Sequence, residues 1–250
     1  NTTIRLGPLR GELLDRNRER LAISATVESV SASPRRIENA LLPSQQLGGA
    51  LGLAPHEIRR RLEGGRSFVW IQRWVTPEEA DRVRSLGLPG VHLHPERKRF
   101  YPSRDLAAAY LGFAGRDGVG LSGLELRFDN ALRGHPTSIP ARRDAAGKQL
   151  VSFGNNPAAR SGARVILALD SRLQHFAERQ LDAAVARTGA AHATLVAIDP
   201  RSGDILALAE RPSFDPNLFW TQDPEAFRTR AFVHPFEPGS TLKPLSLIHI

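Results

Sequence analysis

Two residues near the end of the sequence, Ser240 and Lys243, have the types and the spacing of a nucleophile and its base. Pro238-Gly239 is a turn signal before them, so we expect Ser240 to lie in the first turn of a helix. Residues three apart share one helix face, which would place the lysine amine above the serine hydroxyl. A lysine amine can remove the hydroxyl proton when burial or nearby cations lower its pKa. The spacing therefore indicates nucleophilic catalysis by a serine.

The choice of lysine at position 243 strengthens this interpretation. The sequence has 34 basic residues, and its only lysines are Lys98, Lys148 and Lys243. Arginine keeps its proton in proteins, whereas lysine can lose it, so a lysine in an arginine-rich chain suggests a need for a titratable amine. The spacing also arises by chance, and a solvated surface pair is the alternative interpretation.

Composition narrows the possible classes of function. At 250 residues the chain is long enough for two domains, and a hydrophobic content of 41% is that of a folded protein. The chain has no cysteine, which excludes disulfides and thiolate metal sites, and its eight histidines lack metal-ligand spacing. The net charge of +8 comes from arginines interleaved with acids. We therefore expect attraction to an anionic envelope surface and no nucleic-acid partner.

The sequence has no apolar run that approaches the ~20 residues of a membrane span, and no signal peptide. Methionine is absent even at position 1. We therefore expect a mature or trimmed chain.

The first 158 residues alternate between strands, short helices and loops. Thr76-Pro77-Glu78-Glu79 predicts a helix start, with a threonine cap and a glutamate three residues later, and Gly87 ends that helix. Gly118-x-Gly120-x-x-Gly123 is interpreted as loop geometry, because no strand–loop–helix unit surrounds it. Strands are expected within 2–6, 10–22, 27–32, 68–71 and 91–101, and helices within 34–64, 102–110 and 125–134.

The pattern changes after a loop-rich stretch, and we place a domain boundary between residues 158 and 159. Beyond it we expect a strand over 165–169 and a helix opened by a capping box at Ser171-x-x-Gln174. Two strands, 193–198 and 205–209, should form a hairpin, and 217–236 should be mostly irregular. One face of the helix should be buried: Leu173, Phe176, Ala177, Leu181, Ala184 and Val185.

Sequence blocks along the whole chain resemble a known family. Six of these blocks, in order, are Arg10-Gly11 with Asp15-Arg16-Asn17, Arg99-Phe100-Tyr101-Pro102, Gly120-x-x-Gly123-Leu124-Glu125, Leu169-Asp170-x-x-Leu173-Gln174, Asp199-Pro200-x-x-Gly203-Asp204, and Phe236-Glu237-Pro238-Gly239-Ser240-x-x-Lys243-Pro244. Their order and compact spacing resemble the class B penicillin-binding proteins, and are most similar to the septal, cell-division type. Ser-x-x-Lys is itself a signature of penicillin-binding proteins.

Three features depart from the family pattern. Arg18 stands where the family usually has glycine, so we expect Asn17 to take the left-handed conformation of the turn. His135-Pro136-Thr137 replaces a glycine-containing loop. The family completes its site with Ser-x-Asn and Lys-Thr/Ser-Gly, and neither motif occurs in the 250 residues. We therefore expect the chain alone to show no transpeptidase activity and little or no covalent penicillin binding.

The resemblance implies an α+β fold in two parts. Residues 1–158 would form an elongated N-terminal pedestal module of strands and short helices that binds partners and carries no chemistry. Residues 159–250 would form the first part of a transpeptidase domain, with the serine β-lactamase-like α/β architecture and an antiparallel sheet. We interpret four charged residues of the pedestal as internal ion pairs and turn supports: Arg10, Asp15, Arg16 and Glu125.

The resemblance also implies a D,D-transpeptidase that cross-links peptidoglycan stem peptides in septal cell-wall synthesis. Ser240 would attack the carbonyl between two D-alanines and form an acyl-enzyme, and Lys243 would take its proton. β-Lactams would acylate Ser240 in the same way. The reaction would need no cofactor and no metal.

The expected partners are stem peptides ending in D-Ala-D-Ala, β-lactams, a septal glycosyltransferase and other divisome membrane proteins. A single-pass anchor preceding this chain would hold it at the bacterial inner membrane, on the periplasmic side. The alternatives from other classes are a non-catalytic divisome scaffold and a β-lactam sensor that keeps the fold.

Overall fold

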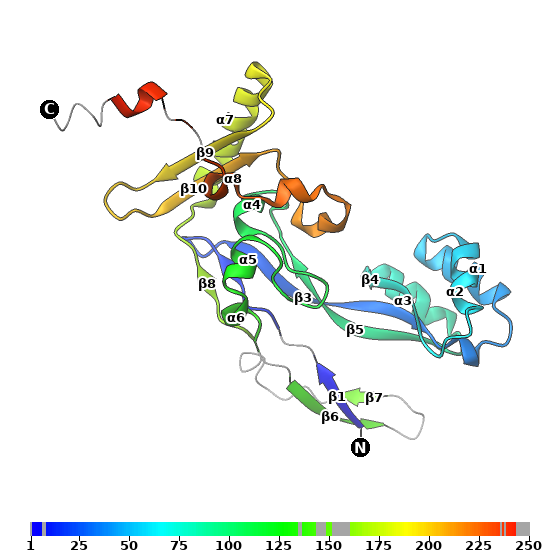
Figure 1. Cartoon of the computed structure of the whole chain (residues 1–250). Coiled ribbons are helices and arrows are strands. Elements are labelled where there is room, and N and C mark those ends of the chain that lie inside the picture. Colours follow the sequence, from blue (N-terminus) through cyan, green and yellow to red (C-terminus); the bar gives the residue numbers. More distant parts are fainter. Residues whose placement is uncertain are drawn as a thin grey trace.

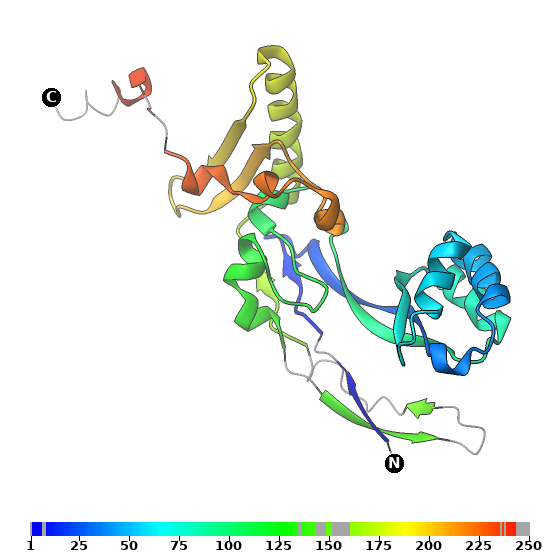
Figure 2. The ribbon, with the colours of Figure 1, turned by 45° about the vertical axis from the view of Figure 1, so that its right-hand side comes forward.

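The computed structural model of the chain is elongated, with a central body and an arm that ends in a helical globule (Figure 1, Figure 2). The described residues are 2–6, 9–134, 137–143, 149–151, 161–235, 237 and 239–243. Short helices are combined with mostly antiparallel sheets, which confirms the predicted α+β class.

A five-stranded sheet connects the body to the arm. Its long strand β3 (Arg20–Ala32) pairs with β2 (Leu13–Leu14) near its start and lies between β4 (Val69–Val75) and β5 (Val91–Phe100) near its end. The fifth strand, β8 (Val165–Ile166), pairs in parallel with β2. A segment that follows the predicted boundary therefore joins the sheet of the segments that precede it.

The arm ends in three helices packed on one face of the sheet: α1 (Leu41–Leu51), α2 (Pro55–Leu62) and α3 (Pro77–Leu86). The capping box predicted for α3 is present, because the Thr76 hydroxyl accepts from the Glu79 N–H while the Glu79 carboxylate accepts from the Thr76 N–H. The buried side chains between helices and sheet include Val30, Leu47, Leu51, Ile58, Leu62, Val69, Ile71, Val75 and Val83. Alternation along β4 places Trp70 on the opposite face of this sheet.

The body contains three short helices, α4 (Ala108–Leu111), α5 (Gly123–Arg127) and α6 (Asp129–Leu132). The helix predicted from residue 102 begins only at Ala108, after a run of turns, and the single helix predicted over 125–134 is two. The body core draws on distant segments and includes Leu13, Leu21, Tyr101, Leu111, Phe113, Leu132, Leu167, Leu169 and Phe214. The two predicted parts of the chain therefore share one hydrophobic core.

A small antiparallel sheet lies near the N-terminus, below α6 and β5 in the view of Figure 1. It contains β1 (Thr2–Leu6), β6 (Thr137–Arg143) and β7 (Gln149–Val151), in the order β1-β6-β7. The strand predicted at 2–6 is confirmed. The boundary between residues 158 and 159 lies outside the described residues and stays a prediction.

Beyond β8, a long helix packs on a hairpin as predicted. The helix α7 (Ser171–Thr188) lies against the antiparallel pair β9 (Ala193–Ile198) and β10 (Ile205–Arg211). The predicted buried face is wrong at Phe176, which is 60% exposed. The buried face is rotated toward Gln174 and Glu178 and includes two predicted apolar residues, Ala177 and Leu181.

The capping box predicted at Ser171 and Gln174 is also wrong. The helix cap is Asp170, whose Oδ1 accepts from two N–H groups of the first turn at 3.0 and 3.2 Å. Ser171 instead donates its hydroxyl to Asp15 Oδ2 at 2.7 Å, and Gln174 is fully buried. Tertiary contacts decide which of two adjacent cap-forming residues caps the helix.

After the hairpin the chain returns to the body through three short helical turns, η3 (Pro216–Thr221), η4 (Pro224–Phe227) and α8 (Arg230–Val233). Aromatic rings fix this return, because Phe113 of the body stacks on Phe219 of η3 with ring centroids 4.5 Å apart. The prediction that residues 217–236 are mostly irregular is therefore wrong for the described part of this segment, which forms short helical turns held by packing.

The turn after β2 differs from the prediction. Arg18 itself takes the left-handed conformation, with φ of 65°, and Asn17 does not. Asp15 supports the turn as predicted, since its Oδ1 accepts from the N–H groups of Asn17 and Glu19, both at 2.8 Å. The prediction of an internal ion pair is wrong for Arg16, whose side chain is exposed and forms no ion pair with another described residue.

Candidate functional site

The predicted nucleophile and base lie in and after a four-residue 3₁₀ helix, η5 (Gly239–Leu242). Ser240 is the second residue of this helix and Lys243 follows it, so the predicted helical turn is present. Both side chains are exposed, and neither forms a hydrogen bond or ion pair with any other described residue. The catalytic roles of Ser240 and Lys243 stay predictions.

The segment leading to η5 contains two buried charged residues. Glu210, at the end of β10, is 4% exposed, and its Oε1 accepts from the Ala231 N–H at 2.6 Å. Arg230 is 7% exposed and donates through one terminal nitrogen to the Glu225 carbonyl at 3.3 Å. Glu210 Oε2 and the Nε and other terminal nitrogen of Arg230 have no partner in the described part of the chain. These groups keep unused hydrogen-bonding positions beside the approach to Ser240.

Gln174 fixes the hairpin against α7. Its side-chain amide donates to the Leu208 carbonyl and accepts from the Leu208 N–H, both at 2.8 Å. A buried amide that pairs with both backbone groups of one strand residue leaves no polar atom unsatisfied there. Sequence reasoning missed this role, because the apolar periodicity of α7 does not reveal that Gln174 and Glu178 lie on the buried face.

The first turn of α7 is bound to the N-terminal turn through Asp15. Asp15 Oδ2 accepts from the backbone N–H and the hydroxyl of Ser171, at 3.1 and 2.7 Å. Burial alone would raise the pKa of Asp15, but the hydrogen bonds from Ser171, Glu19 and Asn17 outweigh it and lower that pKa. An ionised Asp15 therefore joins the two parts of the chain.

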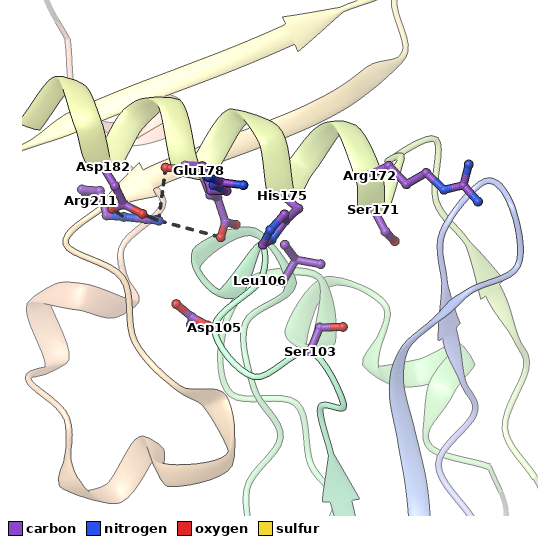
Figure 3. Close-up of a pocket in the computed structure, with 10 residues that line it drawn as sticks. Ser103, Asp105, Leu106, Ser171, Arg172, His175, Glu178, Asp182 and Arg211 are labelled. Atoms are coloured by element: carbon purple, nitrogen blue, oxygen red, sulfur yellow. Dashed lines mark hydrogen bonds and ion pairs between the residues drawn. The ribbon is translucent and has the colours of Figure 1, made fainter.

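A second contact between the parts borders a cavity of about 610 Å³, lined by α7 and by the turns before α4 (Figure 3). Glu178 Oε1 accepts from the Ala107 N–H and the Gln174 amide, both at 2.7 Å. Arg211 donates to Asp182 Oδ2 at 2.8 Å and lies 3.8 Å from Glu178 Oε2. Burial raises the pKa of Glu178. Neither Ser240 nor Lys243 lines this cavity, so it is a junction between parts and not the candidate catalytic site.

The predicted internal ion pairs of the N-terminal part are present. Glu125 is fully buried; its Oε2 lies 2.5 Å from Arg10 Nε and its Oε1 lies 2.7 Å from Arg99 Nε. The Tyr101 hydroxyl also donates to Glu125, at 3.3 Å, and Arg10 reaches Asp129 at 2.6 Å. Burial, followed by the Glu125 charge, raises the pKa of Tyr101. These charged residues hold the body together and are not arranged for catalysis.

Among the described residues, no group of three or more histidine, cysteine, aspartate or glutamate side chains could hold a metal ion. His94, from the His92-x-His94 pair, forms a hydrogen bond between its Nε2 and the Ser31 hydroxyl at 2.7 Å on the sheet face. None of the helices in the described part combines the length and the apolar character needed to cross a bilayer.

Comparison with known families identifies both parts. Residues 5–167 match the penicillin-binding protein dimerisation domain, and residues 193–249 match the penicillin-binding protein transpeptidase domain. The chain belongs to the penicillin-binding proteins. Relatives named peptidoglycan D,D-transpeptidases PenA and FtsI confirm the predicted resemblance to class B members.

Three curated relatives illustrate the similarity. The chain is 38% identical over 242 residues to a probable peptidoglycan D,D-transpeptidase PenA of Neisseria meningitidis and 34% identical over 244 residues to the peptidoglycan D,D-transpeptidase FtsI of Escherichia coli. Each of these alignments covers 94% of this chain and 41% of the relative. The stage V sporulation protein D of Bacillus subtilis is 33% identical over 245 residues, covering 96% of this chain and 38% of that protein. The chain thus spans about two fifths of the length of these relatives.

Two solved structures share the fold. A peptidoglycan synthetase from Bifidobacterium adolescentis aligns with a TM-score of 0.62 at 24% identity, covering 98% of this chain and 50% of that one. Penicillin-binding protein 2X from Streptococcus thermophilus aligns with a TM-score of 0.61 at 21% identity, covering 91% and 38%. These matches confirm the predicted architecture of a pedestal module followed by the start of a transpeptidase domain.

Proposed function

We propose that this protein is a peptidoglycan D,D-transpeptidase of septal cell-wall synthesis, and a target of β-lactam antibiotics. The observation that carries the proposal is the transpeptidase-domain match over residues 193–249, which includes Ser240-x-x-Lys243. Relatives at 34–38% identity that are named peptidoglycan D,D-transpeptidases support it.

In the proposed reaction, the Ser240 hydroxyl attacks the carbonyl carbon between the two D-alanines of a stem peptide. The Lys243 amine takes the hydroxyl proton, and the terminal D-alanine leaves with a proton on its new amine. An amine of a second stem peptide then attacks the acyl-enzyme, which forms the cross-link and frees Ser240. The Ser240 N–H would be one oxyanion donor.

The remaining proposals concern organisation. Residues 1–158 would form a non-catalytic pedestal that contacts the septal glycosyltransferase and other divisome membrane proteins, and residues 159–250 would begin the catalytic domain. The protein would act on the periplasmic side of the bacterial inner membrane, held there by a single-pass anchor. The shared core and the contacts of Asp15 and Glu178 support a fixed orientation of pedestal and catalytic domain.

Labelling with a fluorescent penicillin tests the proposal, in a form of the protein as long as its relatives. Ser240→Ala should abolish covalent labelling, and Lys243→Arg should abolish it while the fold stays intact, because arginine cannot serve as the base. Ser202→Ala and Lys98→Arg are the matched controls and should label normally.

Three results would change the proposal. Absence of labelling in the unsubstituted protein would favour a non-catalytic divisome scaffold. Labelling without cross-linking of stem peptides would favour a β-lactam sensor. Labelling that survives Lys243→Arg would exclude the lysine as the base.

A further inference from the structure

All three tryptophans of the sequence, Trp70, Trp74 and Trp220, lie on one surface of the molecule. Trp70 and Trp74 are in β4, on the sheet face opposite the arm helices, whereas Trp220 comes from η3 beyond the hairpin. Arg73 and Arg116 each lie over two of the rings, and Lys98 lies over Trp74 alone. The tryptophan surface comprises Trp70, Arg73, Trp74, Lys98, Arg116 and Trp220.

The rings and the cations alternate across this surface. The Arg73 guanidinium lies 5.5 Å from the Trp70 ring and 5.7 Å from the Trp74 ring. Lys98 Nζ lies 5.4 Å from Trp74, and the Arg116 guanidinium lies 5.6 Å from Trp74 and 5.4 Å from Trp220. These separations are those of cation–π contacts. The contacts join a strand of the N-terminal part to a turn of the transpeptidase part.

The backbone at Trp74 is held in a costly conformation. Its φ is 60°, in the left-handed region that β-sheet tryptophans avoid. The register between β3 and β4 shifts at this point, so Arg73 and Trp74 occupy a bulge opposite residues 28–30. The indole Nε1 of Trp74 is buried, with no hydrogen-bond partner among the described residues. A strained bulge that aims an aromatic ring at a surface is a feature of binding sites.

Part of the surface is open to a ligand. Trp220 is 45% exposed and Trp70 is 36% exposed. Arg73 is neutralised by Glu96, which accepts two bonds from it at 2.9 and 2.7 Å. Within the described residues, no carboxylate lies at ion-pair distance from Lys98 or Arg116. The surface therefore presents two open aromatic rings and two cations that form no ion pair with another described residue.

The exposed indole rings and the unpaired cations indicate the kind of ligand that the surface would bind. The negative face of an indole ring attracts the slightly positive C–H groups on the flat face of a sugar ring. Unpaired lysine and arginine side chains attract carboxylates. A polymer that carries both groups at regular intervals would fit the alternation of rings and cations.

We propose that the tryptophan surface binds peptide-bearing glycan strands of peptidoglycan, at a site separate from Ser240. N-Acetyl sugar rings would stack on Trp70 and Trp220, and carboxylates of the strand would pair with Lys98 and Arg116. The choice of polymer rests on the proposed function, because other anionic chains with flat rings share the same chemistry. A bound strand would contact both parts of the chain.

Intrinsic fluorescence tests this directly, because every indole of the 250-residue chain lies on the tryptophan surface. The chain is titrated with uncross-linked glycan strands that carry stem peptides. We expect a saturable change in tryptophan emission that weakens as salt is added. N-Acetylglucosamine oligomers, which have sugar rings without carboxylates, and free stem peptides, which have carboxylates without sugars, should each bind about tenfold more weakly, a difference of ~1.4 kcal/mol.

Substitutions test whether binding depends on the tryptophan surface and not on other parts of the molecule. Arg116→Glu and Trp220→Ala should each weaken co-sedimentation with peptidoglycan sacculi by about tenfold or more. Two matched controls lie elsewhere and should bind normally: Arg187→Glu at the end of α7, and Phe232→Ala, another exposed aromatic residue, in α8. Equal binding by all four variants, or no binding by the unsubstituted chain, would overturn the proposal.

A single-stranded oligothymidine is the competing class of ligand, since stacked bases and phosphates meet the same rings and cations. Binding of the oligonucleotide at equal or lower concentration than the glycan strand would also overturn the proposal. In the form of the protein as long as its relatives, penicillin labelling of Ser240 should be unchanged by Arg116→Glu. Absence of strand binding by the unsubstituted protein, together with normal labelling of its Ser240, would thus reject the tryptophan surface alone, whereas absence of labelling in the unsubstituted protein would reject the proposed function.

Discussion

Replacing Glu125 by alanine should destabilise the protein by about 3–5 kcal/mol, the cost of breaking a buried ion pair from one side. Glu125 is fully buried between Arg10 and Arg99, at 2.5 and 2.7 Å. After the change Arg10 keeps Asp129 at 2.6 Å, whereas Arg99 keeps no carboxylate among its described contacts. Because Arg10 keeps one carboxylate and only Arg99 is left without one, we expect a loss toward the lower end of the range.

The assay is urea unfolding followed by far-UV circular dichroism, with a thermal scan beside it. For a chain of this size a loss of 3–5 kcal/mol corresponds to a fall in Tm of roughly 6–20 °C. Glu63→Ala is the matched control, because Glu63 pairs with Arg59 at 2.6 Å while both side chains are 51% exposed. That exposed pair should contribute at most ~0.5 kcal/mol. A loss for Glu125→Ala below ~1 kcal/mol, or equal to the control, would refute the assignment of Glu125 as the centre of the ionic cluster.

A second comparison separates ionic pairing from packing. Replacing Glu125 with leucine and Arg99 with methionine in the same chain should recover much of the lost stability, since apolar side chains of similar size often substitute for a buried pair. A double variant as unstable as the sum of the single changes would show that the two residues act independently.

Three further predictions concern the junction and the glycine loop. Asp15→Asn should lower the free energy of unfolding by about 1–3 kcal/mol at neutral pH. Because the folded pKa of Asp15 is lowered from 3.8, its contribution to stability is present above that value and is lost as pH falls through the folded pKa. Below about pH 4, the urea midpoint of Asp15→Asn should therefore change less with pH than that of the unsubstituted protein. Glu178 has the opposite sign: its folded pKa is raised from 4.5, so stability falls as pH rises through the raised pKa, and Glu178→Gln should remove that fall in urea midpoints measured from pH 4 to 8. Gly120→Ala should unfold the loop, because the Cβ of an alanine at this position would lie 2.0 Å from the Glu125 carbonyl oxygen. The control Gly49→Ala in α1 places its Cβ in open space and should raise Tm slightly. A Gly120→Ala chain as stable as the unsubstituted chain would contradict the close approach.

The elements set by local chemistry were predictable from the sequence. The start of α3 follows from Thr76 and Glu79, whose capping bonds need no distant partner. The hairpin of β9 and β10 follows from two apolar runs around a polar turn. In both, the decisive interactions join residues a few positions apart.

The elements set by tertiary contacts were not predictable. Asp170 and Ser171 are both good cap residues, and the choice between them depends on Asp15, which lies more than 150 positions away and accepts the Ser171 hydroxyl. The left-handed Arg18 likewise depends on a turn closed by Asp15. The mistaken helix face at Phe176 has the same origin, since apolar periodicity does not reveal that Gln174 is buried by pairing with β10.

The candidate sites show the same contrast between local motifs, which the sequence reveals, and tertiary arrangements, which it does not. Ser240 and Lys243 form a local motif, so their types and spacing suffice to propose the reaction, and the family match includes them. The tryptophan surface is assembled from β4, β5, the loop at Arg116 and η3, with a bulge that no single segment encodes. Its cations are indistinguishable in the sequence from the many other arginines of the chain.

The contacts of α7 explain how the two parts of the molecule keep one arrangement. Its first turn is bound to the N-terminal turn through Ser171 and Asp15, and its middle is bound to the α4 segment through Glu178 and Ala107. Two contacts about two helical turns apart fix both the position and the direction of a helix. Since Gln174 binds α7 to β10, the N-terminal part sets the orientation of the hairpin. The segment that leads to Ser240 leaves from the end of β10, so the same contacts determine where the candidate nucleophile's segment begins.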